Sequence, residues 1–182
     1  QHNSSEVVIF GGSSPGLCFN DVFSFSVRTC QWTLHEPTGV SPAPRSGHSV
    51  CRVGESMYVF GGNTTEDSFN DLWEYAMDKR AWAQVRTRGA APSPRVGHVL
   101  VPFGDRLMVF GGRKYTDNSF DPALHCYDLQ RRRWSDLKVH GEHPQVRTGH
   151  AAIPCGSGFL VFGGLGQNGE YFNDTFLLRL WS

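Results

Sequence analysis

Three histidines occur in the same short pattern, Arg-x-Gly-His, at His48, His98 and His150. Imidazole groups can bind metal ions and transfer protons, so the three together raise the question of a metal or catalytic site. Metal ligands must converge on one point, whereas these histidines recur 50 and 52 residues apart, one in each repeated unit. We therefore predict a structural role in each unit, with the imidazole hydrogen-bonded near the start of a strand, and no metal ion or other cofactor.

The arginines of the same pattern are Arg45, Arg95 and Arg147. A guanidinium group has five N–H donors and can tie several loop carbonyls together, which is the structural interpretation that we favour. The alternative, in which these arginines face a ligand, stays open at this point.

The other residues that could take part in catalysis give little support to an enzymatic function. The five cysteines include no C-x-x-C pair, so we expect reduced thiols packed as small hydrophobic groups. No H-x-H, H-E-x-x-H or G-x-S-x-G motif is present, and nothing resembles a nucleophile with its base. We predict that the chain is not an enzyme, with a site assembled from distant units as the alternative.

The histidine pattern belongs to a longer repeat. Phe-Gly-Gly occurs four times, at steps of 50, 50 and 52 residues, and each Arg-x-Gly-His lies 12 residues before the next Phe. A tryptophan follows three of the Phe residues after 22, 22 and 24 residues. The glycine pairs are Gly11 and Gly12, Gly61 and Gly62, Gly111 and Gly112, and Gly163 and Gly164, and the tryptophans are Trp32, Trp82 and Trp134. Several features in one register predict a repeat architecture.

Each unit is predicted to be a four-stranded sheet. In the second unit we expect strands at 47–53, 56–60, 71–76 and 81–85, separated by turns and one loop. The glycine pairs let the chain leave a strand with positive φ and approach its neighbour closely. Tryptophans at the fourth strand are expected to pack between units, and Asp21, Asp71 and Asp174 to accept backbone N–H bonds.

These residues resemble the kelch repeat of the galactose oxidase-like and kelch superfamily: a double glycine after a hydrophobic strand, an aromatic third strand and a tryptophan in the fourth. The resemblance implies an all-β fold, a kelch-type β-propeller whose blades stack face to face. Some kelch-like propellers are copper enzymes with a Tyr–Cys crosslink. Cys126 and Tyr127 are adjacent here, but strand neighbours point to opposite faces and cannot form that crosslink.

The repeat predicts one segment, 1–182, that forms a partial ring of two complete and two incomplete blades. The expected blades are 7–35 (partial), 45–86, 95–138 and 147–182 (partial). Propellers usually need more blades to close, so we expect the remaining blades to come from the rest of a longer chain or from a second chain.

We predict a protein–protein interaction module, such as a substrate-recognition or assembly subunit, because long loops on a rigid scaffold usually carry recognition residues. The resemblance implies that the loops between strands two and three and those between blades share one rim. The candidate partner-binding residues are Arg113, Lys114, Tyr115 and Asp117, followed by Glu66, Asp67 and Arg88.

Charge and hydropathy further limit the classes of partner that we expect. Lys+Arg and Asp+Glu both number 17, so the chain lacks the basic excess typical of nucleic-acid binding. No apolar run approaches the ~18 residues of a membrane helix. We expect a protein partner, neither nucleic acid nor membrane, and a cytoplasmic or nuclear location. Three N-x-[ST] sequons, one at Asn63, leave an extracellular, glycosylated domain as the alternative.

Overall fold

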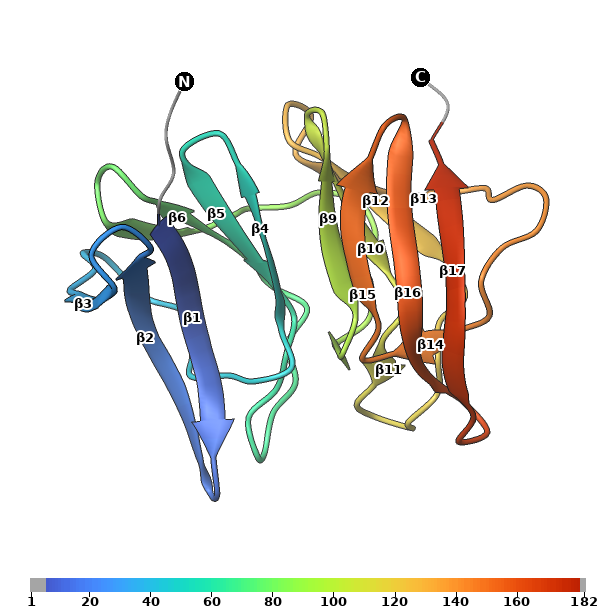
Figure 1. The fold of residues 1–182 in the computed structure, drawn as a ribbon, viewed down its shortest axis with the longest axis horizontal. Helices are drawn as coiled ribbons and strands as arrows, with labels where there is room; N and C mark the ends of the chain where they lie inside the picture. Colours follow the sequence, from blue (N-terminus) through green and yellow to red (C-terminus); the bar gives the residue numbers. More distant parts are fainter. Residues whose placement is uncertain (1–5, 181–182) are drawn as a thin grey trace.

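The structure, a computed structural model, describes residues 6–180. Within this range every regular element is a strand, and no helix is long and apolar enough to cross a membrane. The strands form four main antiparallel sheets that stand side by side as the blades of a propeller (Figure 1). The prediction of an all-β, kelch-type partial ring is therefore confirmed.

The blades follow one another in chain order. Blade I contains β1 (Glu6–Ser14), β2 (Leu17–Ser26) and β3 (Gln31–His35). Blade II contains β4 (Ser49–Val53), β5 (Ser56–Phe60), β6 (Leu72–Ala76) and β7 (Ala81–Gln84). Blade III contains β9 (Val99–Phe103), β10 (Arg106–Phe110), β12 (Leu124–Asp128) and β13 (Arg133–Leu137). Blade IV contains β14 (Arg147–Thr148), β15 (Ala151–Cys155), β16 (Gly158–Gly166) and β17 (Tyr171–Arg179). The short strands β8 (Arg95–Val96) and β11 (Arg113–Lys114) pair with each other beside blade III.

The first strand of each complete blade lies innermost. β4 lies against β9, and β9 lies against β15, so these strands follow one another around the propeller axis. The glycines of the Arg-x-Gly-His pattern also form a hydrogen-bonded series: Gly97 N–H donates to Gly47 O at 2.9 Å, and Gly149 N–H donates to Gly97 O at 2.8 Å. All three have positive φ, which favours glycine at this position.

The hydrophobic core consists of three clusters, one between each pair of neighbouring blades. Phe10, Met57 and Trp82 belong to the cluster between blades I and II, and Phe60 and Trp134 to that between II and III. The third cluster, between III and IV, includes Phe110 and Phe159 among its buried residues. Strands of blades II and III are apolar on both faces for this reason: Leu72 faces one cluster and Tyr75 the other.

The tryptophans of the fourth strands show how neighbouring blades interlock. Trp82 of blade II lies 4.9 Å from Phe10 of blade I, and Trp134 of blade III lies 5.1 Å from Phe60 of blade II, measured between ring centroids. The prediction that Trp32 packs between two blades is wrong. Trp32 is 57% exposed and contacts Phe23 and Phe25 of its own blade. It occupies the same register position, but no preceding blade supplies a phenylalanine within residues 6–180.

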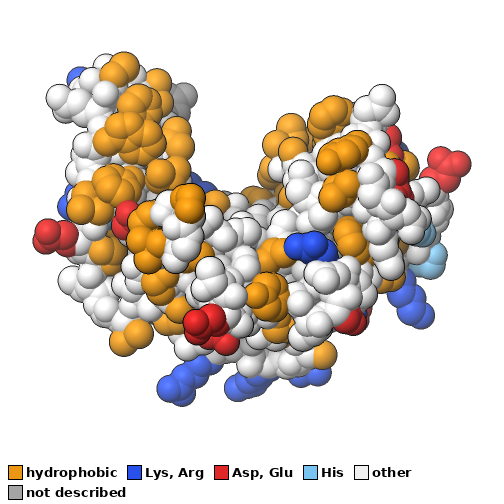
Figure 2. Space-filling view, turned by 90° about the horizontal axis from the view of Figure 1, so that it is seen from below, with side chains coloured by type: hydrophobic (Ala, Val, Ile, Leu, Met, Phe, Trp, Pro, Cys, Tyr) orange, Lys and Arg blue, Asp and Glu red, His pale blue; other side chains and the backbone are white. Residues whose placement is uncertain are grey.

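The ring is open, and hydrophobic side chains line both walls of the opening (Figure 2). The wall of blade I carries Ile9, Trp32 and Leu34, each at least 44% exposed. The wall of blade IV carries Ile153 and Phe162, which are 60% and 53% exposed. Each wall matches a face that is buried in the interior blades, so the expectation that further blades cover these faces remains a prediction.

Candidate functional site

The three arginines of the repeat are fully buried and hold the loop between strands two and three of their own blade. Arg45 donates from Nη1 to Gly61 O at 2.9 Å and from Nε to Ala43 O at 3.0 Å. It also forms a bidentate pair with Asp71, with N···O distances of 2.6 and 3.0 Å. Arg147 repeats this arrangement with Gln145, Gly163 and Asp174, and its proximity lowers the pKa of Asp174.

These guanidinium groups are enclosed rather than presented to solvent. Arg45 lies over the ring of Phe69 at 4.1 Å, and Arg147 lies over Phe172 at 4.3 Å. Their donors are used within the blade, so the geometry supports the structural interpretation and not the ligand-facing alternative. The aspartates differ from their prediction: we expected them to accept backbone N–H bonds, but the carboxylates of Asp71 and Asp174 accept charged hydrogen bonds from Arg45 and Arg147.

The histidines connect each blade to the one before it. The imidazole of His98 packs edge-on against Phe60, and its Nε2 lies 3.1 Å from Phe60 O. His48 and His150 pack edge-on beside Phe10 and Phe110, at centroid distances of 5.2 and 5.5 Å. Neither ring nitrogen of His150 has a hydrogen-bond partner among the described residues, so the predicted imidazole hydrogen bond is not formed there. Burial, and then the neighbouring arginine, lower the pKa of His48 and of His150 to about 4, and that of His98 to about 3. The imidazoles are therefore neutral near pH 7.

The glycine pairs make this contact between blades possible. Gly62 N–H donates to Arg95 O of the next blade at 3.0 Å, and Gly12 and Gly112 make the equivalent bonds to Arg45 and Arg147. A Cβ atom on Gly61 would lie 2.8 Å from Cε1 of His98, closer than real Cβ contacts allow. Phe-Gly-Gly and the following Arg-x-Gly-His are thus two halves of one inter-blade contact. Gly163 and Gly164 adopt the same positive φ in blade IV.

Blade III contains a polar network that the sequence analysis did not identify. His125 takes the position of Trp73 of blade II and lies between two carboxylates: Nε2 is 3.2 Å from Asp121 and Nδ1 is 2.6 Å from Asp136. Asp121 also accepts from Arg95 at 2.8 Å. Burial alone would raise the pKa of Asp121, but the Ala123 N–H and the Arg95 guanidinium lower it. The only sequence signal was the departure of residues 120–127 from the common pattern.

The predicted partner-binding residues fall into two groups. Tyr115 is 37% exposed and donates from its hydroxyl to Thr65 O at 3.2 Å, which joins the loops of blades II and III. Glu66 and Asp67 follow Thr65 directly and are exposed. Arg113 and Asp117 are also exposed, Lys114 is half-buried, and all three belong to the loop that carries Tyr115. The joined loops therefore bring six of the seven predicted residues into one surface, which we call the rim surface.

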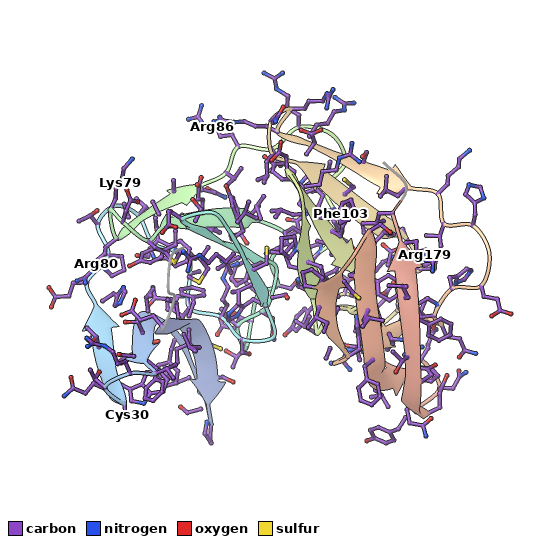
Figure 3. The ribbon with its side chains drawn as sticks, turned by 45° about the horizontal axis from the view of Figure 1, so that its top comes forward. Cys30, Lys79, Arg80, Arg86, Phe103 and Arg179 are labelled. Carbon is purple, nitrogen blue, oxygen red and sulfur yellow. The ribbon has the colours of Figure 1, made fainter. Side chains whose placement is uncertain are left out.

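Arg88 is separate from the rim surface. Its backbone N–H donates to Arg132 O at 2.8 Å, and its carbonyl accepts from Trp134 N–H at 2.9 Å, at the free edge of β13. In the described part of the chain no hydrogen bond joins it to the loop of Tyr115. Lys79, Arg80 and Arg86, which precede it in the chain, project outward from the molecule (Figure 3).

The structure gives no separate support to a metal or crosslinked site. Among residues 6–180, no group of three or more His, Cys, Asp or Glu side chains is placed to hold a metal ion. Cys126 packs in the cluster between blades III and IV, whereas Tyr127 packs in the cluster between II and III. Their side chains thus point to opposite faces of the sheet, as strand geometry requires.

The repeated four-stranded sheets and their arginine and histidine contacts define a β-propeller built from kelch repeats. A family model described as "KLHDC2/KLHL20/DRC7 Kelch-repeats domain" matches residues 2–182. The chain belongs to this family of kelch-repeat domains, which are commonly protein-interaction modules.

Similar curated proteins are much longer than this chain. The Rho GTPase-activating protein gacHH of Dictyostelium discoideum is 33% identical over 161 residues, which cover 88% of the chain and 8% of that protein. Host cell factor 1 of Rattus norvegicus is 37% identical over 57 residues, 31% of the chain and 3% of that protein. The serine/threonine-protein phosphatase BSL2 of Arabidopsis thaliana is 35% identical over 57 residues, 31% of the chain and 6% of that protein. The similarity thus concerns a small part of each relative.

Proposed function

We propose that the chain is a protein-binding module that holds its partner on the rim surface, as a substrate-recognition or assembly subunit does. The observation that carries the proposal is the bond from Tyr115 to Thr65, which fixes two exposed loops from different blades against each other. Two loops held in one geometry present Arg113, Glu66 and Asp67 with little loss of conformational freedom on binding.

The loops are also ordered individually. Thr64 Oγ1 accepts from the N–H groups of Glu66 and Asp67 at 3.1 and 2.8 Å. In the second loop, Asp117 accepts from Ser119 N–H at 2.9 Å, and Lys114 N–H donates to Ser119 O at 2.8 Å. The surface combines an aromatic side chain with charges of both signs, a composition suited to a polar protein partner with a complementary pattern.

The test is a comparison of partner capture by the wild-type chain and by a double variant, Arg113→Ala with Tyr115→Ala. The matched control is Arg52→Ala with Glu55→Ala, which removes an exposed ion pair at the opposite, short-turn side of blade II. We expect proteins that bind the wild type and the control to be lost from the rim variant. If the rim variant retains every protein that the control retains, the rim surface is not the binding site.

A further inference from the structure

Two tyrosines at equivalent positions face the preceding blade, and only one of their hydroxyl groups has a partner. Tyr75 of blade II pairs with Trp82, Tyr127 of blade III pairs with Trp134, and both tyrosines are fully buried. The Tyr75 hydroxyl lies 2.9 Å from Nδ1 of His35 in blade I. Within the range that the structure describes, the Tyr127 hydroxyl is buried and has no hydrogen-bond partner. Buried hydroxyl groups are usually hydrogen-bonded, so that of Tyr127 requires an explanation.

Between blades I and II, one imidazole serves two hydroxyl groups. The Nδ1 atom of His35 lies at the Tyr75 hydroxyl, and its Nε2 atom lies 2.9 Å from Oγ of Ser24. A neutral imidazole has one N–H donor and one acceptor nitrogen, so it donates to one of these groups and accepts from the other. His35 therefore fills the space between the two blades and gives both hydroxyl groups a partner.

The same position between blades II and III has different residues. The strand register and the 50-residue spacing place Val85 where blade I has His35, and Glu74 where blade I has Ser24. Val85 has no polar side-chain atom to offer the Tyr127 hydroxyl. The interface thus keeps the tyrosine and a polar group in the second place, but not the imidazole that connects them.

A pocket of about 360 Å³ lies at this position, and we call it the tyrosine pocket. Tyr127, Glu74, Val85 and Tyr58 all line it. Glu74 accepts from Ser56 Oγ at 2.6 Å, and a carboxylate can accept further hydrogen bonds. Burial and then Glu74 raise the pKa of Tyr58 to about 12, and burial raises the pKa of Tyr127. Both phenols are therefore protonated near pH 7 and can donate. The volume is sufficient for a side chain of imidazole size.

The mouth of the tyrosine pocket is basic. Arg86 and Arg132 line it and are exposed, and Arg86 projects outward (Figure 3). Arg88 lies beside them, since its N–H donates to Arg132 O. Among residues 6–180, none of these three side chains forms an ion pair. A ligand with negative charge next to the group that enters the pocket is therefore favoured.

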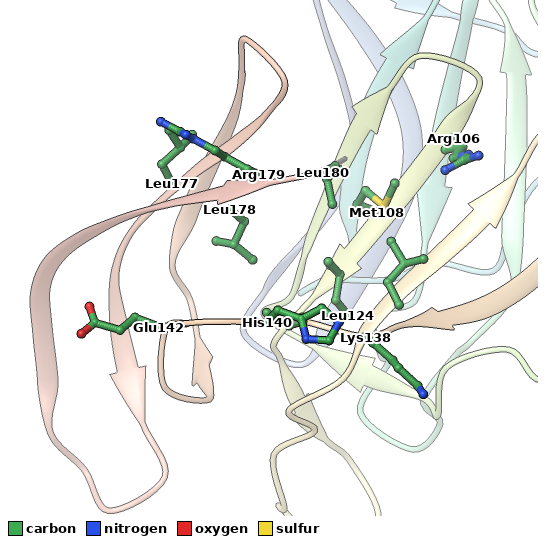
Figure 4. Close-up of a pocket in the computed structure, with 12 residues that line it drawn as sticks. Arg106, Met108, Leu124, Lys138, His140, Glu142, Leu177, Leu178, Arg179 and Leu180 are labelled. Carbon is green, nitrogen blue, oxygen red and sulfur yellow. The ribbon is translucent and has the colours of Figure 1, made fainter. Parts of the chain in front are cut away.

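The pocket between blades III and IV is larger, about 440 Å³, but it has different chemistry (Figure 4). Leu178 follows Thr175 by three residues as Tyr127 follows Leu124, and Thr175 and Leu124 pair with equivalent phenylalanines. Leu178 thus takes the tyrosine position, so this larger pocket has no buried hydroxyl group there. A buried hydroxyl that needs a partner distinguishes the tyrosine pocket.

We propose that the tyrosine pocket binds a histidine side chain of a partner protein, with an acidic residue beside that histidine in contact with Arg86 or Arg132. A neutral imidazole accepts from the Tyr127 hydroxyl with one ring nitrogen and donates to Glu74 with the other. The bound histidine repeats the contact that His35 makes between blades I and II. No residue of the rim surface lines the pocket, so this site is separate from the rim surface.

The test uses the 182-residue chain and the synthetic peptide acetyl-Glu-Asp-His-Asp-Glu-amide. Titration is followed in ¹H–¹⁵N NMR spectra of the chain. We expect saturable shifts of the amides at 83–86 and 127–132, and at least fivefold weaker affinity when alanine replaces the histidine of the peptide. Equal affinity of the two peptides would show that the arginines bind acidic peptides without the pocket, and it would overturn the proposal.

A matched pair of variants locates the binding. Tyr127→Phe removes only a hydroxyl group that no described residue uses, and it keeps the packing against Trp134. Tyr75→Phe removes the same group where His35 is its partner. Both variants should keep the far-ultraviolet circular dichroism of the wild type. We expect at least fivefold weaker binding of the histidine peptide for Tyr127→Phe and a change under twofold for Tyr75→Phe. Unchanged binding by Tyr127→Phe would contradict the assignment.

A third variant fills the pocket from within the chain. Val85→His offers an imidazole at the position of His35, so we expect a folded chain that no longer gives saturable binding of the histidine peptide. Wild-type affinity in this folded variant would show that the peptide binds elsewhere, and the proposal would be wrong.

Discussion

His98 of blade III lies against Phe60 of blade II, with its Nε2 3.1 Å from the Phe60 carbonyl oxygen and its ring edge-on to the phenyl group. The residues are 38 positions apart, yet they belong to the two motifs that recur most regularly in the sequence. The contact explains why the spacing between these motifs is nearly constant from unit to unit. The Phe-Gly-Gly motif of one blade packs against the Arg-x-Gly-His motif of the next blade.

Neutral histidines at the blade interfaces predict an acid-sensitive fold. The pKa of His98 in the folded state is about 3 and those of His48 and His150 about 4, below the ordinary value of 6.5. Between pH 6.5 and 4 the unfolded chain binds more protons than the folded chain, so stability falls as the pH falls. Urea unfolding across this range should show a decreasing free energy of unfolding.

The variant His98→Asn provides the control for this prediction. Its amide keeps a donor near Phe60 O but does not titrate. The slope of stability against pH between 6.5 and 4 should be smaller than in the wild type. The carboxylates that titrate lower, including Asp174, should contribute mainly below pH 4. An unchanged slope in His98→Asn would show that the interface histidine is not responsible.

The buried arginines are predicted to be among the most sensitive positions. Arg45→Ala should lower the free energy of unfolding by roughly 3–5 kcal/mol, because it leaves Asp71 and the Gly61 carbonyl without their partner. Arg52→Ala removes an exposed ion pair with Glu55 and should cost about 0–1 kcal/mol. Chemical denaturation of both variants tests the difference, and similar losses would contradict the assigned role of Arg45.

Tryptophan substitutions should distinguish covered from uncovered blade faces. Trp134→Ala removes a side chain that is 2% exposed and should cost roughly 3–5 kcal/mol. Trp32 occupies the same register position on the open face and is 57% exposed. The substitution Trp32→Ala should therefore lower the free energy of unfolding by under about 1 kcal/mol. Thermal unfolding of the two variants provides the comparison. A large loss for Trp32→Ala would mean that another molecule covers this face in solution.

Two glycine substitutions separate backbone strain from steric conflict. Gly54→Ala meets no atom within 4 Å and should cost only the strain of its positive φ, about 1 kcal/mol. Gly61→Ala has a similar φ, but its Cβ would also lie 2.8 Å from His98 Cε1 and 3.1 Å from Arg95 O. It should therefore destabilise the chain clearly more than Gly54→Ala does in the same denaturation experiment. Equal losses would show that blades II and III can move apart without cost.

The structure of a single blade could be predicted from the sequence, because the residues that specify it are close together in the chain and recur in every unit. Four strands, a double glycine and a tryptophan recur in a constant register, so the repeated unit and its strand order could be predicted from spacing. Kelch membership was expected from the resemblance of these residues to the kelch repeat, and the family match confirms it. The same register also identified the loop of Tyr115, because the third unit departs from the pattern there.

The tertiary structure decided what each repeated residue touches. Equal positions in the sequence have different surroundings in different blades of the described structure: Trp134 is buried, whereas Trp32 is exposed. The partners of Asp71, the bond from Tyr115 to Thr65 and the bridging position of His125 join residues from different strands and loops. A repeat pattern specifies the unit, but side-chain contacts depend on how units stack, and stacking is a property of the folded chain.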